Sequence, residues 1–293
     1  MTFLSDRIPG LSRNDRRLLS YVKQNLLPPG EWEEGEYLPD RRMGHAGIDL
    51  RVEAQIALLS ELREAPYQSL FAALREDPEI QAGVEGVEYD RTQLLHNGFF
   101  PTPDAEFYAA MVLRNQPGRV IEVGSGYSTL VARKAIRHGG LSTRITVIDP
   151  EPRRSVGQAA DDVRLTRVED SGLSADDLAP GDILFIDSSH VCRFGGDLPY
   201  LFCEVLPALG ENVFVHVHDI FLPYDYPRSY VGRIYTEQYL LHALLAGGEK
   251  FEVVLAGHYL AREQLEALRA AVSPKIASHP YFYGASFWMR TTS

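Results

Sequence analysis

The stretch Arg119–Thr129, RVIEVGSGYST, decides the fold of this chain. It joins a short apolar run to a glycine turn, Gly124 to Gly126, and then to a helical pattern that begins at about Ser128. Glycines at a strand-to-helix junction permit positive φ angles and a close approach of the backbone to a ligand. The first turn of the helix adds backbone N–H groups without intrahelical partners. The stretch therefore predicts a strand, a ligand-binding turn and a helix.

Short apolar runs continue to alternate with helical patterns after this unit. Further strands are expected at Arg144–Ile148, Arg164–Val168, Asp182–Ile186, Asn212–Val217, Phe251–Leu255 and Ser286–Arg290. Helices are expected at Leu50–Arg63, Asp104–Asn115, about Ser128–Arg137, from about Arg153, around Leu198–Leu209, at Thr236–Leu245 and at Arg262–Val272. Such alternation indicates a parallel sheet covered on both faces. The long excursion before Ser286 fits an antiparallel hairpin at the sheet edge.

An acidic residue, Asp149, follows the second predicted strand, where a carboxylate can accept hydrogen bonds from both hydroxyls of a ribose. A dinucleotide fingerprint would have a third glycine where Thr129 stands. Glu122 would also add negative charge beside a pyrophosphate. The pattern therefore disfavours NAD and suits a nucleoside cofactor with a cationic amino-acid part, such as S-adenosylmethionine.

Metal-ligand side chains follow two further strands. The sequence IDSSH supplies Asp187 and His190, and VHVHDI supplies His216, His218 and Asp219. The ends of neighbouring parallel strands point into one crevice, so these groups can converge. The simpler alternatives are that Asp187 only contacts the cofactor, that His216 is a core or supporting histidine, and that His190 is a ligand, a general base or a loop contact.

These residues carry a resemblance to class I S-adenosylmethionine-dependent methyltransferases, in the branch of macrocin-type sugar O-methyltransferases and cephalosporin-hydroxylase-like proteins. It runs from about Asn97 to Arg290, through PGRVIEVGSGYSTLVAR, DILFIDSSH, VHVHDIFLPYDYP, YTEQYLLHALL and GASFWMR. The resemblance implies an α/β, Rossmann-like sheet of seven strands in the order 3-2-1-4-5-7-6, with strand seven antiparallel. It divides the chain into an N-terminal helical cap, residues 1–100, and a methyltransferase domain, residues 101–293.

The resemblance also implies roles for individual residues. The cofactor-binding residues would be Glu122, Gly124, Ser125, Gly126, Tyr127, Ser128, Asp149, Asp170 and Asp187. Glu169 could replace Asp170 at the adenine. A divalent metal would be bound by Asp187, Asp219 and His218, and the imidazole favours Mn, Fe or Zn over Mg. His190 is the expected general base, with Asp187 as its catalytic neighbour.

The cap is expected to close over the acceptor, with a dimer interface as the alternative. Phe99, Phe100, Tyr108 and the loop Phe221–Tyr230 could frame the acceptor or simply pack the cap onto the sheet. A further helix is expected at Asp15–Leu26. Glu237, at the start of a predicted helix, is expected to be structural.

Composition restricts the function classes. The 293 residues carry a net charge of −11, which disfavours nucleic acid or an anionic membrane as the main partner. There is no apolar run of about 18 residues, and the first residues lack the apolar region of a secretory signal. Two cysteines exclude a disulfide framework. We expect a cytoplasmic protein that forms no membrane contacts and can be a homo-oligomer.

The expected function is methyl transfer from S-adenosylmethionine to a small-molecule acceptor, at a hydroxyl group, assisted by the metal. Two alternatives stay open: a metal-dependent iron oxygenase or hydroxylase on the same fold, and a non-catalytic protein that binds S-adenosylmethionine. Fold and cofactor do not identify the acceptor.

Overall fold

The computed structural model describes residues 40–83, 87–276 and 284–292, so the expected helix Asp15–Leu26 lies outside the described residues. A seven-stranded sheet with the order β3-β2-β1-β4-β5-β7-β6 forms its centre. β7 pairs antiparallel with both of its neighbours. This confirms the predicted α/β, Rossmann-like arrangement. The strands are β1 Arg119–Val123, β2 Arg144–Ile148, β3 Asp162–Arg164, β4 Ile183–Ile186, β5 Phe214–Val217, β6 Phe251–Ala256 and β7 Phe287–Thr291.

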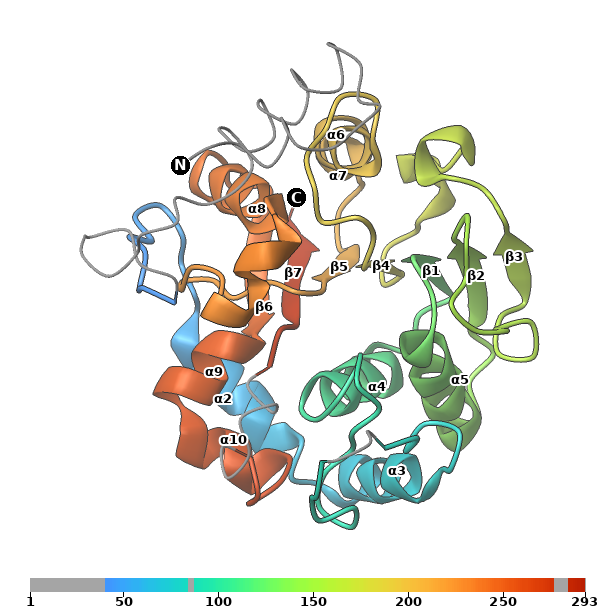
Figure 1. The fold of residues 1–293 in the computed structure, drawn as a ribbon, viewed down its shortest axis with the longest axis vertical. Helices are drawn as coiled ribbons and strands as arrows, with labels where there is room; N and C mark the ends of the chain where they lie inside the picture. Colours follow the sequence, from blue (N-terminus) through green and yellow to red (C-terminus); the bar gives the residue numbers. More distant parts are fainter. Residues whose placement is uncertain (1–39, 84–86, 277–283, 293) are drawn as a thin grey trace, which may run out of the picture.

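Helices cover both faces of this sheet (Figure 1). α3, α4 and α5 lie on one side, and α6, α7 and α8 lie on the other. Every residue of β4 and β5 is buried, which explains why these strands are continuous apolar runs with few polar residues. The helices are α2 Val52–Glu61, α3 Ala65–Glu76, α4 Asp104–Asn115, α5 Tyr127–Gly139, α6 Asp197–Tyr200, α7 Leu206–Ala208, α8 Glu237–Ala246, α9 Gly257–Glu263 and α10 Leu265–Ala271. The 3-10 helices are η2 Val168–Asp170, η3 Ala175–Asp177 and η5 Arg228–Arg233, and η4 Leu201–Val205 is a π-helix.

The described residues before residue 100 share one core with the sheet. α2 packs against α10 and β6, and α3 packs against α4 and α5. Leu59 and Phe71 are buried in the same hydrophobic cluster as Val120 and Ile183 of the sheet. The division of the chain into residues 1–100 and 101–293 stays a prediction.

The third strand was predicted too late in the sequence. β3 is Asp162–Arg164, whereas the apolar pattern placed it at Arg164–Val168. β3 lies at the sheet edge and pairs only with β2, whose last residue, Ile148, is opposite Arg164. The residues after Arg164 therefore have no partner strand, and Leu165 is left exposed.

Two helix predictions also need correction. In the described chain, no helix lies between β2 and β3, where one was expected from about Arg153. Pro150, Pro152 and Gly157 break this connection into turns. The single helix expected at Arg262–Val272 is instead two helices, α9 and α10, separated by a non-helical residue, Gln264 (φ −130°, ψ 36°).

In the described part of the chain, every helix is too short or too polar to span a bilayer.

Candidate active site

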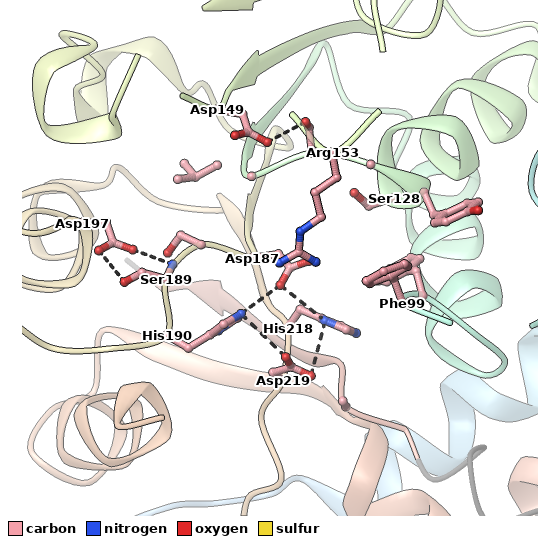
Figure 2. Close-up of a pocket in the computed structure, with 18 of the residues that line it drawn as sticks. Phe99, Ser128, Asp149, Arg153, Asp187, Ser189, His190, Asp197, His218 and Asp219 are labelled. Atoms are coloured by element: carbon pink, nitrogen blue, oxygen red, sulfur yellow. Dashed lines mark hydrogen bonds and ion pairs between the residues drawn. The ribbon is translucent and has the colours of Figure 1, made fainter. Parts of the chain in front are cut away.

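A cavity of about 1470 Å³ opens at the carboxyl ends of β1, β2, β4 and β5. Its wall combines the glycine turn after β1 with the segments that follow the other three strands. The residues from Arg167 to Glu169 after β3, the segment around Phe99 and the turn η5 also line it. This is the position at which open parallel sheets bind ligands. Figure 2 shows the polar side chains that converge there.

The glycine turn brings bare backbone to the cavity. Gly124 has φ +90°, and a Cβ atom there would lie 2.0 Å from the carbonyl oxygen of Asp187. Gly126 has φ +155°, and a Cβ atom there would meet nothing within 4 Å. Only glycine fits the first position, and the second leaves open space for a ligand. The expected cofactor residues Gly124, Ser125, Gly126, Tyr127 and Ser128 all line the cavity.

Glu122 lies beneath this turn and is not part of the cavity wall, contrary to the expected contact with the cofactor. Its carboxylate accepts hydrogen bonds from the hydroxyls of Tyr108 (2.8 Å) and Thr129 (2.5 Å). The Thr129 hydroxyl in turn accepts one from the Gly126 N–H (3.2 Å). Burial raises the pKa of Glu122 to about 7, although these hydrogen bonds oppose the shift. Glu122 and Thr129 therefore position the glycine turn, which explains a threonine in place of a third glycine.

Asp149 lies on the cavity wall next to the glycine turn. Its carboxylate accepts hydrogen bonds from the Ser125 hydroxyl (2.7 Å) and the Glu151 N–H (2.9 Å). The two acidic residues after β3 differ in position. Glu169 lines the cavity, whereas Asp170 lies outside it and pairs with Arg167 at 2.6 Å. The geometry thus favours Glu169 over the expected Asp170 for a contact with a base.

Three groups converge at the ends of β4 and β5 and could hold a metal ion: Asp187, His218 and Asp219, whose ligand atoms all lie within 4.8 Å of one another. Nδ1 of His218 lies 3.6 Å from Asp187 Oδ1 and 3.8 Å from Asp219 Oδ1. These separations exceed a hydrogen bond and leave room for a shared cation. The trio is the one expected from the sequence.

Asp104, from the first turn of α4, lies behind His218. Its Oδ2 is 3.7 Å from Nε2 of His218, and its Oδ1 accepts hydrogen bonds from the Ala285 and Ser286 N–H groups, both at 2.9 Å. A carboxylate on the far side of the ring is the arrangement that orients a metal-binding histidine. Burial alone would lower the pKa of His218, but Asp187 and Asp104 raise it well above its usual range.

His190 is surrounded by acidic side chains on both edges of its ring. Its Nδ1 lies 2.7 Å from Oε2 of the fully buried Glu237, while its Nε2 lies 3.2 Å from Asp187 and 3.7 Å from Asp219. Burial would lower the pKa of His190, but its contacts with Asp187 and Glu237 raise it well above its usual range. Glu237 therefore orients the ring with Nε2 directed towards Asp187 and Asp219.

His216 stays in the core, which was the simpler expectation. It is fully buried, its Nε2 lies 2.9 Å from the Ser286 hydroxyl, and its ring stacks on Trp288 with centroids 4.3 Å apart. Burial lowers its pKa well below the usual range.

Sequence reasoning missed several residues of this site. Glu237 was assigned a structural role, and Asp104 was not singled out. Arg153 and Arg154 line the cavity and stack over Phe99 (5.3 Å) and Tyr127 (4.4 Å), where a helix had been expected. Among these residues, only Asp104 could have been recognised from the sequence. It is an acidic residue in the first turn of a helix beside the glycine turn, and that position faces the strand ends.

Comparison with known proteins gives a family match for part of the chain and similarity to several solved structures. Residues 121–220, from β1 to the end of β5, match a family model described as a methyltransferase domain. A search of curated proteins gave no significant match. Among solved structures, the chain is similar to the O-methyltransferase TomG from Streptomyces achromogenes, with 16% identity, TM-score 0.39 and coverage of 82% of this chain and 96% of that one. It is also similar to the methyltransferase PaMTH1 from Podospora anserina, with 14% identity, TM-score 0.40 and 98% of each chain covered.

Residues 121–220 thus match a methyltransferase domain, and the sheet has the strand order that the resemblance implied for class I S-adenosylmethionine-dependent methyltransferases. The macrocin-type branch stays a prediction.

Proposed function

We propose that this protein transfers a methyl group from S-adenosylmethionine to a hydroxyl of a small molecule, and that a divalent cation bound by Asp187, His218 and Asp219 assists the transfer. The observation that carries the proposal is the position of Asp187. Its backbone packs against Gly124 of the glycine turn, and its side chain belongs to the cation cluster. The cofactor turn and the cation cluster thus belong to one cavity, as methyl transfer to a polarised hydroxyl requires.

The cofactor half of the cavity supports this assignment. The glycine turn would receive the amino-acid part of the cofactor, Asp149 the ribose hydroxyls and Glu169 the base. Arg153 and Arg154 line the same half and carry positive charge that suits the cofactor carboxylate.

The donor set of the cluster fits a divalent cation. Two carboxylates and one imidazole with a supporting carboxylate, Asp104, are typical of Mn, Fe or Zn sites. When bound, the cation would lower the pKa of the acceptor hydroxyl.

A cation bound by Asp187 and Asp219 would offset the acidic charge that raises the pKa of His190, and the neutral imidazole would then be suited to take the proton that the acceptor hydroxyl loses. Glu237 holds its Nδ1, so the proton would be accepted at Nε2, the nitrogen that faces Asp187 and Asp219. The imidazole is 5% exposed, which keeps the proton transfer away from bulk water.

An iron oxygenase is the alternative that shares the cation cluster. The glycine turn with Asp149 favours methyl transfer over it, because oxygen chemistry has no need of a ribose-binding acid. Oxygen uptake without formation of S-adenosylhomocysteine would decide for the oxygenase.

Calorimetric titration tests the proposal. The wild-type chain should bind S-adenosylhomocysteine, and it should bind one Mn²⁺ that is lost in Asp219→Asn and His218→Ala. His138→Ala, which removes an exposed imidazole outside the cavity, is the matched control and should bind Mn²⁺ normally. Failure of the wild type to bind S-adenosylhomocysteine would refute the proposed function, and equal Mn²⁺ binding in all four proteins would refute the cation site.

A further inference from the structure

Two arginines, Arg193 and Arg233, line the cavity, and Arg233 lies beside Asp219 of the candidate cation cluster. Arg193 belongs to the loop between β4 and α6, and Arg233 is the last residue of η5. Neither belongs to the glycine turn or to the segments after β2 and β3 that form the cofactor half. Their positions therefore relate to the acceptor.

Arg233 is held in place by stacking on the ring of Tyr230. Its guanidinium carbon lies 4.1 Å from the centre of the Tyr230 ring, and the Tyr230 hydroxyl donates a hydrogen bond to Asp219 Oδ1 (2.8 Å). Its Nη1 is 3.7 Å from Asp219 Oδ2, which is longer than a hydrogen bond. The side chain stays half exposed. The stacking fixes the plane of the guanidinium while leaving N–H donors for a ligand.

Arg193 has no carboxylate oxygen within 4.0 Å among the residues that the structure describes. Its stem packs over Gly196, where an added Cβ atom would lie 2.9 Å from Arg193 Cγ. The stem is therefore supported by the loop, and the charged end has no acidic partner in the described chain.

The surrounding charge makes these two arginines informative. Asp187 and Asp219 line the cavity, Glu237 is buried behind His190, and the whole protein carries a net charge of −11. If Arg233 only balanced Asp219, Arg193 would still have no acidic group to balance. A neutral acceptor would gain little from either side chain, whereas a carboxylate or phosphate matches the planar donor edge of a guanidinium.

We propose that the acceptor carries an oxyanion, a carboxylate or a phosphate, near the hydroxyl that is methylated, and that Arg193 and Arg233 bind this group. The inference rests on the proposed function and specifies the substrate class of the same site.

The test uses calorimetry on the full chain saturated with S-adenosylhomocysteine, at one fixed Mn²⁺ concentration. The probes are benzoate, phenyl phosphate and the neutral benzyl alcohol. At least one anion should bind about tenfold or more tightly than benzyl alcohol, and the tighter anion identifies the oxyanion. Arg193→Gln and Arg233→Gln should each weaken that binding about tenfold. The control Arg63→Gln removes a charge outside the cavity and should leave it unchanged.

The outcomes separate this inference from the proposed function. Loss of S-adenosylhomocysteine binding in the wild type would refute the proposed function itself. With that binding intact, three results would overturn the oxyanion inference: no binding of either anion, equal binding of benzyl alcohol, or unchanged anion affinity in both cavity variants.

Discussion

Replacing Glu122 by glutamine should change how the stability of the protein depends on pH. Glu122 is fully buried, and burial raises its pKa in the folded chain from an ordinary 4.5 to about 7. The glutamine amide has nearly the same shape as the carboxyl group and can still accept from Thr129 and contact Tyr108. The substitution therefore removes the titration and retains most of the packing around the glycine turn.

The sign of the effect follows from the raised pKa. The folded chain holds the Glu122 proton more tightly than the unfolded chain, so protonation stabilises the fold fully below about pH 4.5. This contribution is lost as the pH rises through about 7. The shift from 4.5 to about 7 corresponds to about 3 kcal/mol, because each pKa unit is worth about 1.4 kcal/mol. Most of it, about 2–3 kcal/mol, should disappear between about pH 5 and about pH 8.

Urea denaturation of both proteins at the two pH values measures this effect. The free energy of unfolding of the wild type, minus that of Glu122→Gln, should fall by about 2–3 kcal/mol on going from about pH 5 to about pH 8. Other titrating groups cancel in this difference. The control Glu249→Gln changes an exposed carboxylate and should give a difference independent of pH. A constant difference for Glu122→Gln would show that this carboxylate titrates normally and would refute the burial argument.

Four further substitutions test individual assignments in and around the cavity. Asp149→Asn should weaken S-adenosylhomocysteine binding about 30-fold or more in calorimetry, because it removes a charged acceptor worth about 2–3 kcal/mol, and unchanged affinity would exclude the ribose contact. Glu169→Gln should weaken the same binding about tenfold and Asp170→Asn should not; the opposite pattern would restore Asp170 as the base contact. Glu237→Gln should lower kcat about tenfold to a hundredfold with little change in the KM for S-adenosylmethionine, because it weakens the bond that orients His190; a change in KM alone, measured in steady-state assays, would contradict that role.

The positions of most strands were predictable from local sequence, whereas their order in the sheet was expected only from the family resemblance. Buried strands are short apolar runs, and the glycine turn after β1 marks the start of the Rossmann-like unit. The position of β3 was not predictable in this way. Its end is determined by the last residue of β2, Ile148, opposite Arg164, and this pairing is not visible in the residues that follow.

The candidate site was predictable where its residues directly follow strands. Asp149, Asp187 and Asp219 each lie at a strand end, and the topology brings the last two together with His218. Glu237 comes from a helix almost fifty residues after His190, and its contact depends on the path of the loop η5. For Glu122, the sequence position was misleading. Its place next to the turn suggested a ligand contact, but its side chain points into the core and accepts a hydrogen bond from the Tyr108 hydroxyl.

A crystal structure of the protein with S-adenosylhomocysteine and Mn²⁺, with an anomalous difference map for the metal, tests the central claim most directly. We expect the ribose hydroxyls at Asp149, the base at Glu169, and one anomalous peak between Asp187, His218 and Asp219. A nucleoside bound elsewhere, or Mn²⁺ absent from that cluster while present at saturating concentration, would contradict it.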